Sequence, residues 1–209
     1  VILVDNSPYA LVLPAFFEDF INNIDDLYQK SKNVTFTKII RYISLILTIL
    51  TPALYLSLIT FDQESIPSEL LTAFATQREG VPFPAFVEAI IMIFSFEILR
   101  ESDMRSNKVS GNTLSIVGAL ILGDAAVSAG IVSPIMIIVV AITTISGLNF
   151  SDINVINVLR KWRAIFMLFA SLCGIIGIGI ATILFIASLV STVSYTKPFT
   201  YPVSPLNFT

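Results

Sequence analysis

The sequence predicts an all-α integral membrane protein, a polytopic helical bundle of about five spans with an amphipathic helix on the membrane surface. Of its 209 residues 55% are hydrophobic and only 13% charged, and the mean hydropathy is +0.86. A single water-soluble domain of this size would expose too much apolar surface. Apolar runs of about 20 residues recur along the chain, and Lys and Arg gather in alternate connections between them.

The spans are expected at roughly 40–60, 83–99, 113–130, 133–150 and 164–190. Each is long enough because about 20 helical residues cross about 30 Å of hydrocarbon. Pro52 predicts a kink in the first span. The last run contains Gly174, Gly177 and Gly179, so it is either one long tilted helix or two pieces that meet at a glycine break.

Three regions are expected along the chain. Residues 1–38 form a junction to an N-terminal cytoplasmic domain that this sequence lacks, residues 39–195 form the transmembrane helical domain, and residues 196–209 form an irregular, Pro-rich tail. Between the first two spans, Ser65 can cap a short helix in which Leu70, Leu71 and Phe74 share one face. This pattern predicts an amphipathic helix on the outer surface.

The positions of Lys and Arg predict the orientation. In chain order, the segment before the first span and those after each span hold four, one, three, none, three and one of them. Because cationic loops are retained inside, residues 100–112 and 152–163 should face the cytoplasm and residues 61–80 the outside. Five spans from a cytoplasmic start would leave the C-terminus outside.

The composition excludes several functions. A net charge of −3 with basic residues in short clusters argues against a nucleic-acid partner. Histidine is absent and Cys173 is the only cysteine, which removes zinc sites, His-based nucleophile systems and any disulfide within the chain. We therefore expect no enzyme activity, no cofactor and no metal site.

Charged residues within or beside the apolar runs are the candidates for function. Glu88 and Glu97 are nine residues apart on one helix and face opposite sides, so they cannot form an acid/base pair. For Glu97 an ion pair with Arg100 near the cytoplasmic end is the favoured interpretation, and a role in an ion path or in subunit coupling is the alternative. For Glu88, which lies in the first helical turn, a structural role and a role in an ion path or subunit coupling are equally supported.

Arg78 is the only basic residue of its loop, and a surface ion pair with its neighbour Glu79 is the favoured interpretation. A role in an ion path or in subunit coupling is the alternative.

Asp124 is the only ionisable residue between residues 115 and 145. Facing lipid would cost about 2.5 to 3.5 kcal/mol, so its side chain should face protein or water. It could be protonated and donate a hydrogen bond, pair with a cation of a partner subunit, or join a ring of copies around a hydrated cation path.

Small residues spaced four apart predict close helix packing. The pairs are Ala119 with Gly123 and Ala126 with Gly130. Such pairs let helix backbones approach closely in lipid, although Gly and Ala are also frequent in membrane helices in general. The partner could be another span, a second copy or another subunit.

Several long motifs resemble a known family. The runs "VILVDNSPYALVLP", "LTPALYLSLITF", "IPSELLTAFATQREGVPFPAFVEAIIMIFSFEILRE" and "LSIVGALILGDAAVSAGIVSPIMIIVVAIT" are similar to the membrane domain of the GerA-type spore germinant receptor A subunits. The similarity runs from Val1 to about Pro205 in one unbroken order.

This resemblance implies a multi-pass protein of the inner membrane of the bacterial endospore. It further implies assembly with a transporter-like B subunit that senses nutrients and a C-subunit lipoprotein, and a role in releasing cations from the spore core. The basic tail that these subunits usually carry would favour a cytoplasmic C-terminus, so an even number of crossings stays open.

Three functional classes follow. The leading one is a pore-forming or gating subunit built from several copies as a homo-oligomer. The second is an accessory membrane scaffold that couples a sensor subunit to a separate channel. The third, a secondary transporter, is less favoured because the sequence shows no inverted repeat and no intramembrane cationic group.

Overall fold

The computed structural model describes residues 2–3, 10–11, 14–22, 26, 31–105, 111–150, 152–194 and 197–201. These residues are mostly helical. The long helices are α2 (Ser31–Thr60), α4 (Ala85–Arg105), α5 (Gly111–Ser128), α6 (Pro134–Gly147) and α7 (Ile153–Ser191). The expected spans each overlap one of them.

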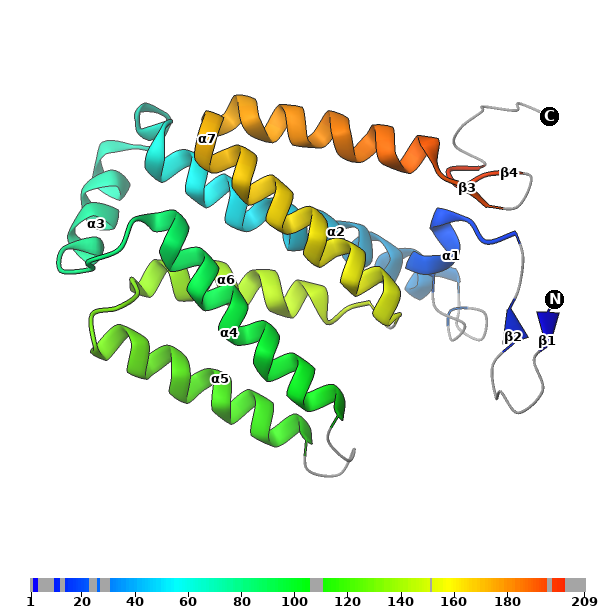
Figure 1. Ribbon diagram of the computed structural model, residues 1–209, viewed down its shortest axis with the longest axis horizontal. Coiled ribbons are helices and arrows are strands. Elements are labelled where there is room, and N and C mark those ends of the chain that lie inside the picture. The colour runs from blue at the N-terminus through cyan, green and yellow to red at the C-terminus, as the bar shows by residue number, and fades with distance from the viewer. Residues whose placement is uncertain are drawn as a thin grey trace.

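The shorter elements lie around the ends of the long helices. They are the antiparallel strands β1 (Ile2–Leu3) and β2 (Ala10–Leu11), helix α1 (Phe17–Ile21), the 3₁₀ turn η2 (Gln63–Ser65), helix α3 (Ser68–Arg78) and the antiparallel strands β3 (Val193–Ser194) and β4 (Lys197–Pro198). Figure 1 shows α1 and the β3–β4 pair at one end of the molecule and α3 at the other.

The predicted surface helix exists but begins later than expected. Ser65 belongs to η2, and Pro67 occupies the N-cap position of α3 without a side-chain hydrogen bond. Leu71 and Phe74 are half-buried against the bundle, whereas Leu70 is exposed. One side of α3 therefore packs on the bundle and the rest is open.

Helix α7 is two helices rather than one. Gly174 has φ 60° and ψ −139°, far from helical values, and the chain turns back there (Figure 1). Trp162 and Phe166 before the break stack edge-on against Phe185 after it, with ring centroids 5.0 and 6.3 Å apart. The two halves run antiparallel, so of the two alternatives for this run the glycine break is the one observed.

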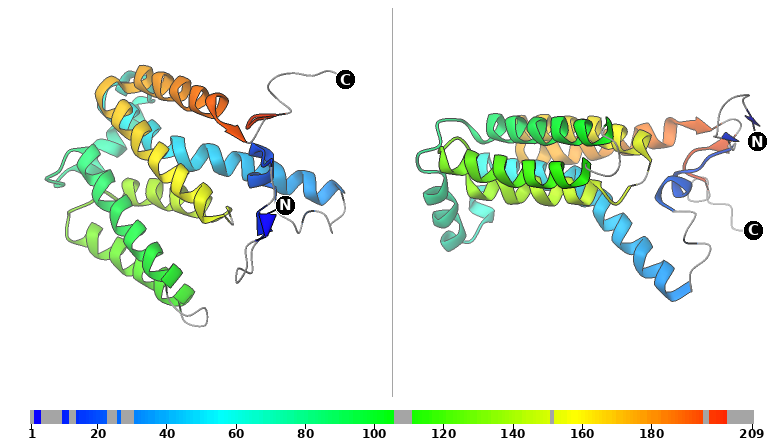
Figure 2. Two further views of the ribbon diagram at one scale, coloured as in Figure 1. Left: turned by 45° about the vertical axis from the view of Figure 1, so that its right-hand side comes forward. Right: turned by 90° about the horizontal axis from the view of Figure 1, so that it is seen from below.

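The hydrophobic core lies among α2, α4, α6 and α7. Leu56, Met92, Met136 and Phe166 are almost completely buried there. Helix α7 packs along α2, and α5 packs on α4 at the edge of the bundle, as both views in Figure 2 show. The N-terminal part of α2 extends away from the bundle (Figure 2, right).

Two helical stretches of the described part are long and apolar enough to cross a membrane, Val34–Thr60 and Ile153–Ser191, and the second contains the break at Gly174. Helix α6 is apolar but has only 14 residues. Five separate spans are therefore not confirmed, and the break at Gly174 makes a different count possible.

The connections between the helices gather at the two ends of the bundle. At one end the backbone turns at Gly80 and Gly130 lie together, and Gly174 lies beside Phe61. At the other end Arg100 donates to the carbonyl oxygen of Gly147 at 3.4 Å. Residues 61–80 thus lie at the opposite end from the connection between α6 and α7, as expected. The segment around Lys197, expected outside, lies instead beside α1 at the end that carries the α6–α7 connection.

Candidate functional site

Glu88 is completely buried at the centre of a polar cluster. It lies in the first turn of α4, and its Oε1 accepts hydrogen bonds from the backbone N–H and the hydroxyl of Ser133, both at 2.5 Å. Ser133 is the N-cap residue of α6, and Pro134 is its first residue. A carboxylate at this point satisfies a free backbone donor and opposes the positive end of the helix dipole.

Arg78 pairs with this buried carboxylate and not with its neighbour. Its Nη2 lies 3.8 Å from Oε2 of Glu88, and the expected surface pair with Glu79 is wrong. The chain turns at Gly80, where φ is 98°, and this turn brings the last turn of α3 over the first turn of α4. The spacing of residues along the sequence indicates only which residues are close within one helix or loop, so it does not predict the ion pair between Arg78 and Glu88.

Ser133 is a site residue that its sequence pattern marks only as the start of a helix. A serine directly before a proline that opens an apolar run is a helix N-terminus pattern. The hydroxyl of Ser133 also accepts from the backbone N–H of Met136 at 3.4 Å. What the pattern could not indicate is that a carboxylate 45 residues earlier would bind the same serine.

Glu97 belongs to a separate cluster at the other end of α4. Its carboxylate pairs with Arg163 at 2.5 Å and with Arg160 at 2.6 Å, both from α7. The expected partner, Arg100, instead donates to the Gly147 carbonyl. Arg163 is only 4% exposed, so Glu97 neutralises a buried cation and ties α4 to α7. Glu88 and Glu97 thus have different partners, as expected for two residues on opposite faces of α4.

Asp124 is exposed on α5. No hydrogen bond or ion pair joins it to another described residue. Ile121, Ala125 and Ser128 are exposed on the same side of the helix. A carboxylate in the middle of an apolar run therefore points away from its own bundle.

The small residues of α5 have different roles. A side-chain Cβ at Gly123 would lie 3.6 Å from the side chain of Ile137 in α6, so this glycine packs within the chain. Ala126 is half-buried and also packs against the core. Gly130 has φ 66° and ends the turn after α5, so its role is conformational. Ala119 lies in α5, but its side chain is outside the described part.

A third polar cluster holds the break in α7. Oδ2 of Asp62 accepts from the backbone N–H of Ile175 at 3.1 Å and from the hydroxyl of Ser57 at 2.6 Å. Ile175 is the first residue after the break, so Asp62 caps the second half of α7 from a distant part of the chain. Only glycine suits position 174, because the Cβ of any other residue would lie 2.9 Å from Cβ of Phe61, which is too close for two carbon atoms.

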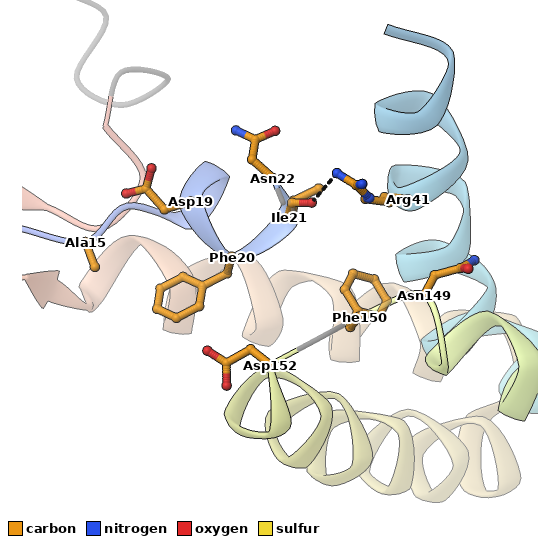
Figure 3. A pocket seen from close by; sticks show the side chains of 9 residues that line it. All are labelled: Ala15, Asp19, Phe20, Ile21, Asn22, Arg41, Asn149, Phe150 and Asp152. Atoms are coloured by element: carbon orange, nitrogen blue, oxygen red, sulfur yellow. Dashed lines mark hydrogen bonds between the residues drawn. The ribbon is translucent and has the colours of Figure 1, made fainter. Parts of the chain in front are cut away.

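A pocket of about 210 Å³ lies at the opposite end of the bundle, between α1, α2 and the connection from α6 to α7. Figure 3 shows its lining: Ala15, Asp19, Phe20, Ile21, Asn22, Arg41, Asn149, Phe150 and Asp152. Arg41 donates to the carbonyl of Ile21 and pairs with Asp26. Asp19 caps α1 and Asp152 caps α7 through backbone N–H groups. Arg41, Asp19 and Asp152, which line the pocket, thus have structural partners within the chain.

In the described part of the chain, no three His, Cys, Asp or Glu side chains gather in a way that could hold a metal ion. The buried charged side chains among the described residues, Asp26, Glu88 and Arg163, each belong to an ion pair.

The fold and these clusters define a class: a helical bundle with helices of membrane-spanning length and charged side chains paired between helices. The chain belongs to the Bacillus/Clostridium GerA spore germination protein family, whose model matches residues 1–209.

Curated relatives are similar to the chain over nearly its whole length. The chain is 40% identical over 206 residues to spore germination protein KA of Bacillus subtilis (strain 168), covering 99% of this chain and 38% of that protein. It is 37% identical to spore germination protein GerLA of Bacillus cereus, covering 98% and 42%. It is 38% identical to the uncharacterized membrane protein YfkQ of Bacillus subtilis (strain 168), covering 98% and 40%.

The chain therefore spans about two fifths of the length of these curated relatives. No solved structure matches it.

Proposed function

We propose that this chain is the membrane domain of an A subunit of a nutrient germinant receptor, and that it forms or gates an ion-conducting assembly. Membership of the GerA family and identity of 37 to 40% to two spore germination proteins support the role in germination. The inner membrane of the endospore is the proposed location. A transporter-like B subunit, a lipoprotein C subunit and further copies of this chain are the proposed partners.

The surface of the bundle supports a place in the membrane. Apolar side chains of several helices are more than 60% exposed, among them Phe94, Ile145, Leu172, Ile176 and Ile183. Exposing these apolar side chains to water is unfavourable in free energy, whereas exposing them to the hydrocarbon of a membrane is not.

Asp124 is the observation that carries the gating proposal. Its carboxylate is exposed on α5 and has no partner among the described residues. Facing lipid would cost about 2.5 to 3.5 kcal/mol. Contact with a second copy, a partner subunit or water removes this cost, and a ring of such carboxylates would attract cations. The exposed side of α5 therefore fits a subunit interface or an ion path.

The test is the substitution Asp124→Asn, which keeps the size of the side chain and its hydrogen bonding but removes the charge. Spores that carry it at normal receptor levels should release cations and germinate more slowly than the parent, while Asp124→Glu should retain most of the activity. Glu18→Gln, an exposed carboxyl on α1, serves as the control. Parental release by Asp124→Asn spores would refute a role of this charge and favour the accessory scaffold.

A further inference from the structure

Helix α3 lies over a space at the end of the bundle expected outside and does not fill it. A second pocket, of about 550 Å³, separates α3 from the end of α2. Ile59 of α2 lines one side, and Leu71, Phe74 and Arg78 of α3 line the other. No residue of α3 is buried. This contact is therefore looser than the core, since packed protein interiors leave few voids larger than a water molecule.

The ion pair under the last turn of α3 is also incomplete. Oε2 of Glu88 is buried and accepts no hydrogen bond from a described residue. Nη2 of Arg78 lies 3.8 Å away, which is too far for a hydrogen bond. Buried carboxylate oxygens are nearly always hydrogen-bonded, because an unpaired one keeps the full cost of losing its water. The void and the unsatisfied oxygen thus lie under the same helix.

One side of this ion pair is fixed and the other can move. Glu88 is held in place by hydrogen bonds from the backbone N–H and the hydroxyl of Ser133. Arg78 is carried by α3, and the chain leaves this helix through Gly80, which has φ 98° and no atom within 4 Å of its Cβ position. A glycine in free space allows the backbone to rotate with little steric cost. Movement of α3 would therefore change the pair from the side of Arg78.

We propose that α3 is a strap that moves between the open position of this structure and a closed position on the bundle. In the closed position the guanidinium of Arg78 donates to Oε2 of Glu88, and Leu71 packs on Ile59 and fills the pocket. Closing gains a charge-assisted hydrogen bond and buries apolar surface, whereas opening restores conformational freedom to the connections of α3.

The strap would link the outer surface to the bundle. Glu88 belongs to α4 and binds the N-cap residue of α6, so closure ties α3 to both helices through one carboxylate. A contact made on α3 would then reach α4 and α6 by changing the balance between the two positions. This inference requires neither ion conduction nor a role for Asp124.

Fluorine NMR of the full-length protein in nanodiscs tests the proposal. In a Cys173→Ser background, a cysteine at Gln77, which is exposed and outside the pocket lining, carries a trifluoromethyl label. The otherwise unchanged protein should give two resonances, one for each position of α3. Arg78→Gln should shift their populations about tenfold towards the open position, because it removes the charge-assisted hydrogen bond. Glu79→Gln, at an exposed neighbour, is the matched control and should leave the populations unchanged.

A second variant identifies the open resonance. Ala75→Trp places an indole in the pocket, so α3 cannot close and only the open resonance should remain. A single resonance that neither Arg78→Gln nor Ala75→Trp changes would overturn the proposal, as would two resonances with a constant ratio in all variants. The melting temperature of each variant checks that it is folded, and if Arg78→Gln is not, Ala75→Trp alone decides. A result against the strap leaves the Asp124→Asn test of cation release unaffected.

Discussion

The buried carboxylate of Glu88 shows how one residue joins three helices. It binds Ser133 at the start of α6, pairs with Arg78 at the end of α3 and is itself part of α4. Removing one partner of a buried ion pair destabilises a protein more than replacing both partners by apolar residues, because the remaining charge is left buried without a partner.

At this scale we expect Glu88→Ala to destabilise the purified protein by about 3 to 5 kcal/mol, since it leaves Arg78 and both Ser133 donors unpaired. Glu88→Gln should cost less because its amide oxygen can still accept from Ser133. Unfolding in denaturant or by heat, with Glu69→Gln on the exposed surface of α3 as the control, measures the difference. Equal stability of Glu88→Ala and the control would contradict the role given to this network.

Among the elements, α7 depends most on one residue. Gly174 has φ 60°, and a Cβ there would lie 2.9 Å from Phe61 and 3.0 Å from Oδ2 of Asp62. Gly174→Ala should therefore lower stability by at least about 1 to 2 kcal/mol through strain and lost capping. Gly179→Ala is the matched control, because nothing lies within 4 Å of its Cβ position and alanine favours helix. Gly174→Ala with a melting temperature equal to the control would show that the turn is not constrained.

The helices were predictable from the sequence because long apolar runs have few alternatives, whereas their partners were not. Each expected span overlaps a helix, but Glu97 binds Arg163, 66 residues away, rather than the Arg100 of its own helix. The sequence alone does not decide between one long helix and two helices over α7, because the deciding contact comes from a distant part of the chain. Several glycines offered a turn, and the choice of Gly174 comes from Asp62, 113 residues before Ile175.

For the whole molecule, the antiparallel halves of α7 bring the chain back to the end where it started. The ring of Phe199 lies 6.1 Å from that of Phe17, and the backbone N–H of Phe17 donates to the carbonyl of Phe199. The segment after α7 is therefore beside α1, which precedes the first long helix. This arrangement favours an even number of crossings over the odd count expected from five spans.

Cysteine labelling tests this topology. In a Cys173→Ser background, single cysteines at Lys161 and Lys197 should react with an impermeant thiol reagent from the same side of the membrane, and a cysteine at Gln77 from the other. Labelling of the Lys161 and Lys197 substitutes from opposite sides would restore the five-span arrangement. The Cys173→Ser protein itself gives the background signal.

The cap on the second half of α7 also sets an order of events during synthesis. The backbone N–H of Ile175 is satisfied by Asp62, a residue that leaves the ribosome 113 positions earlier. Helix α2 and the turn that holds Asp62 must be folded before the second half of α7 forms. Otherwise this half begins with a backbone N–H that has no acceptor. A substitution at Asp62 should thus act late, on the insertion of the last helical hairpin, and leave an intermediate in which the earlier helices are folded and residues 175–191 are open to protease.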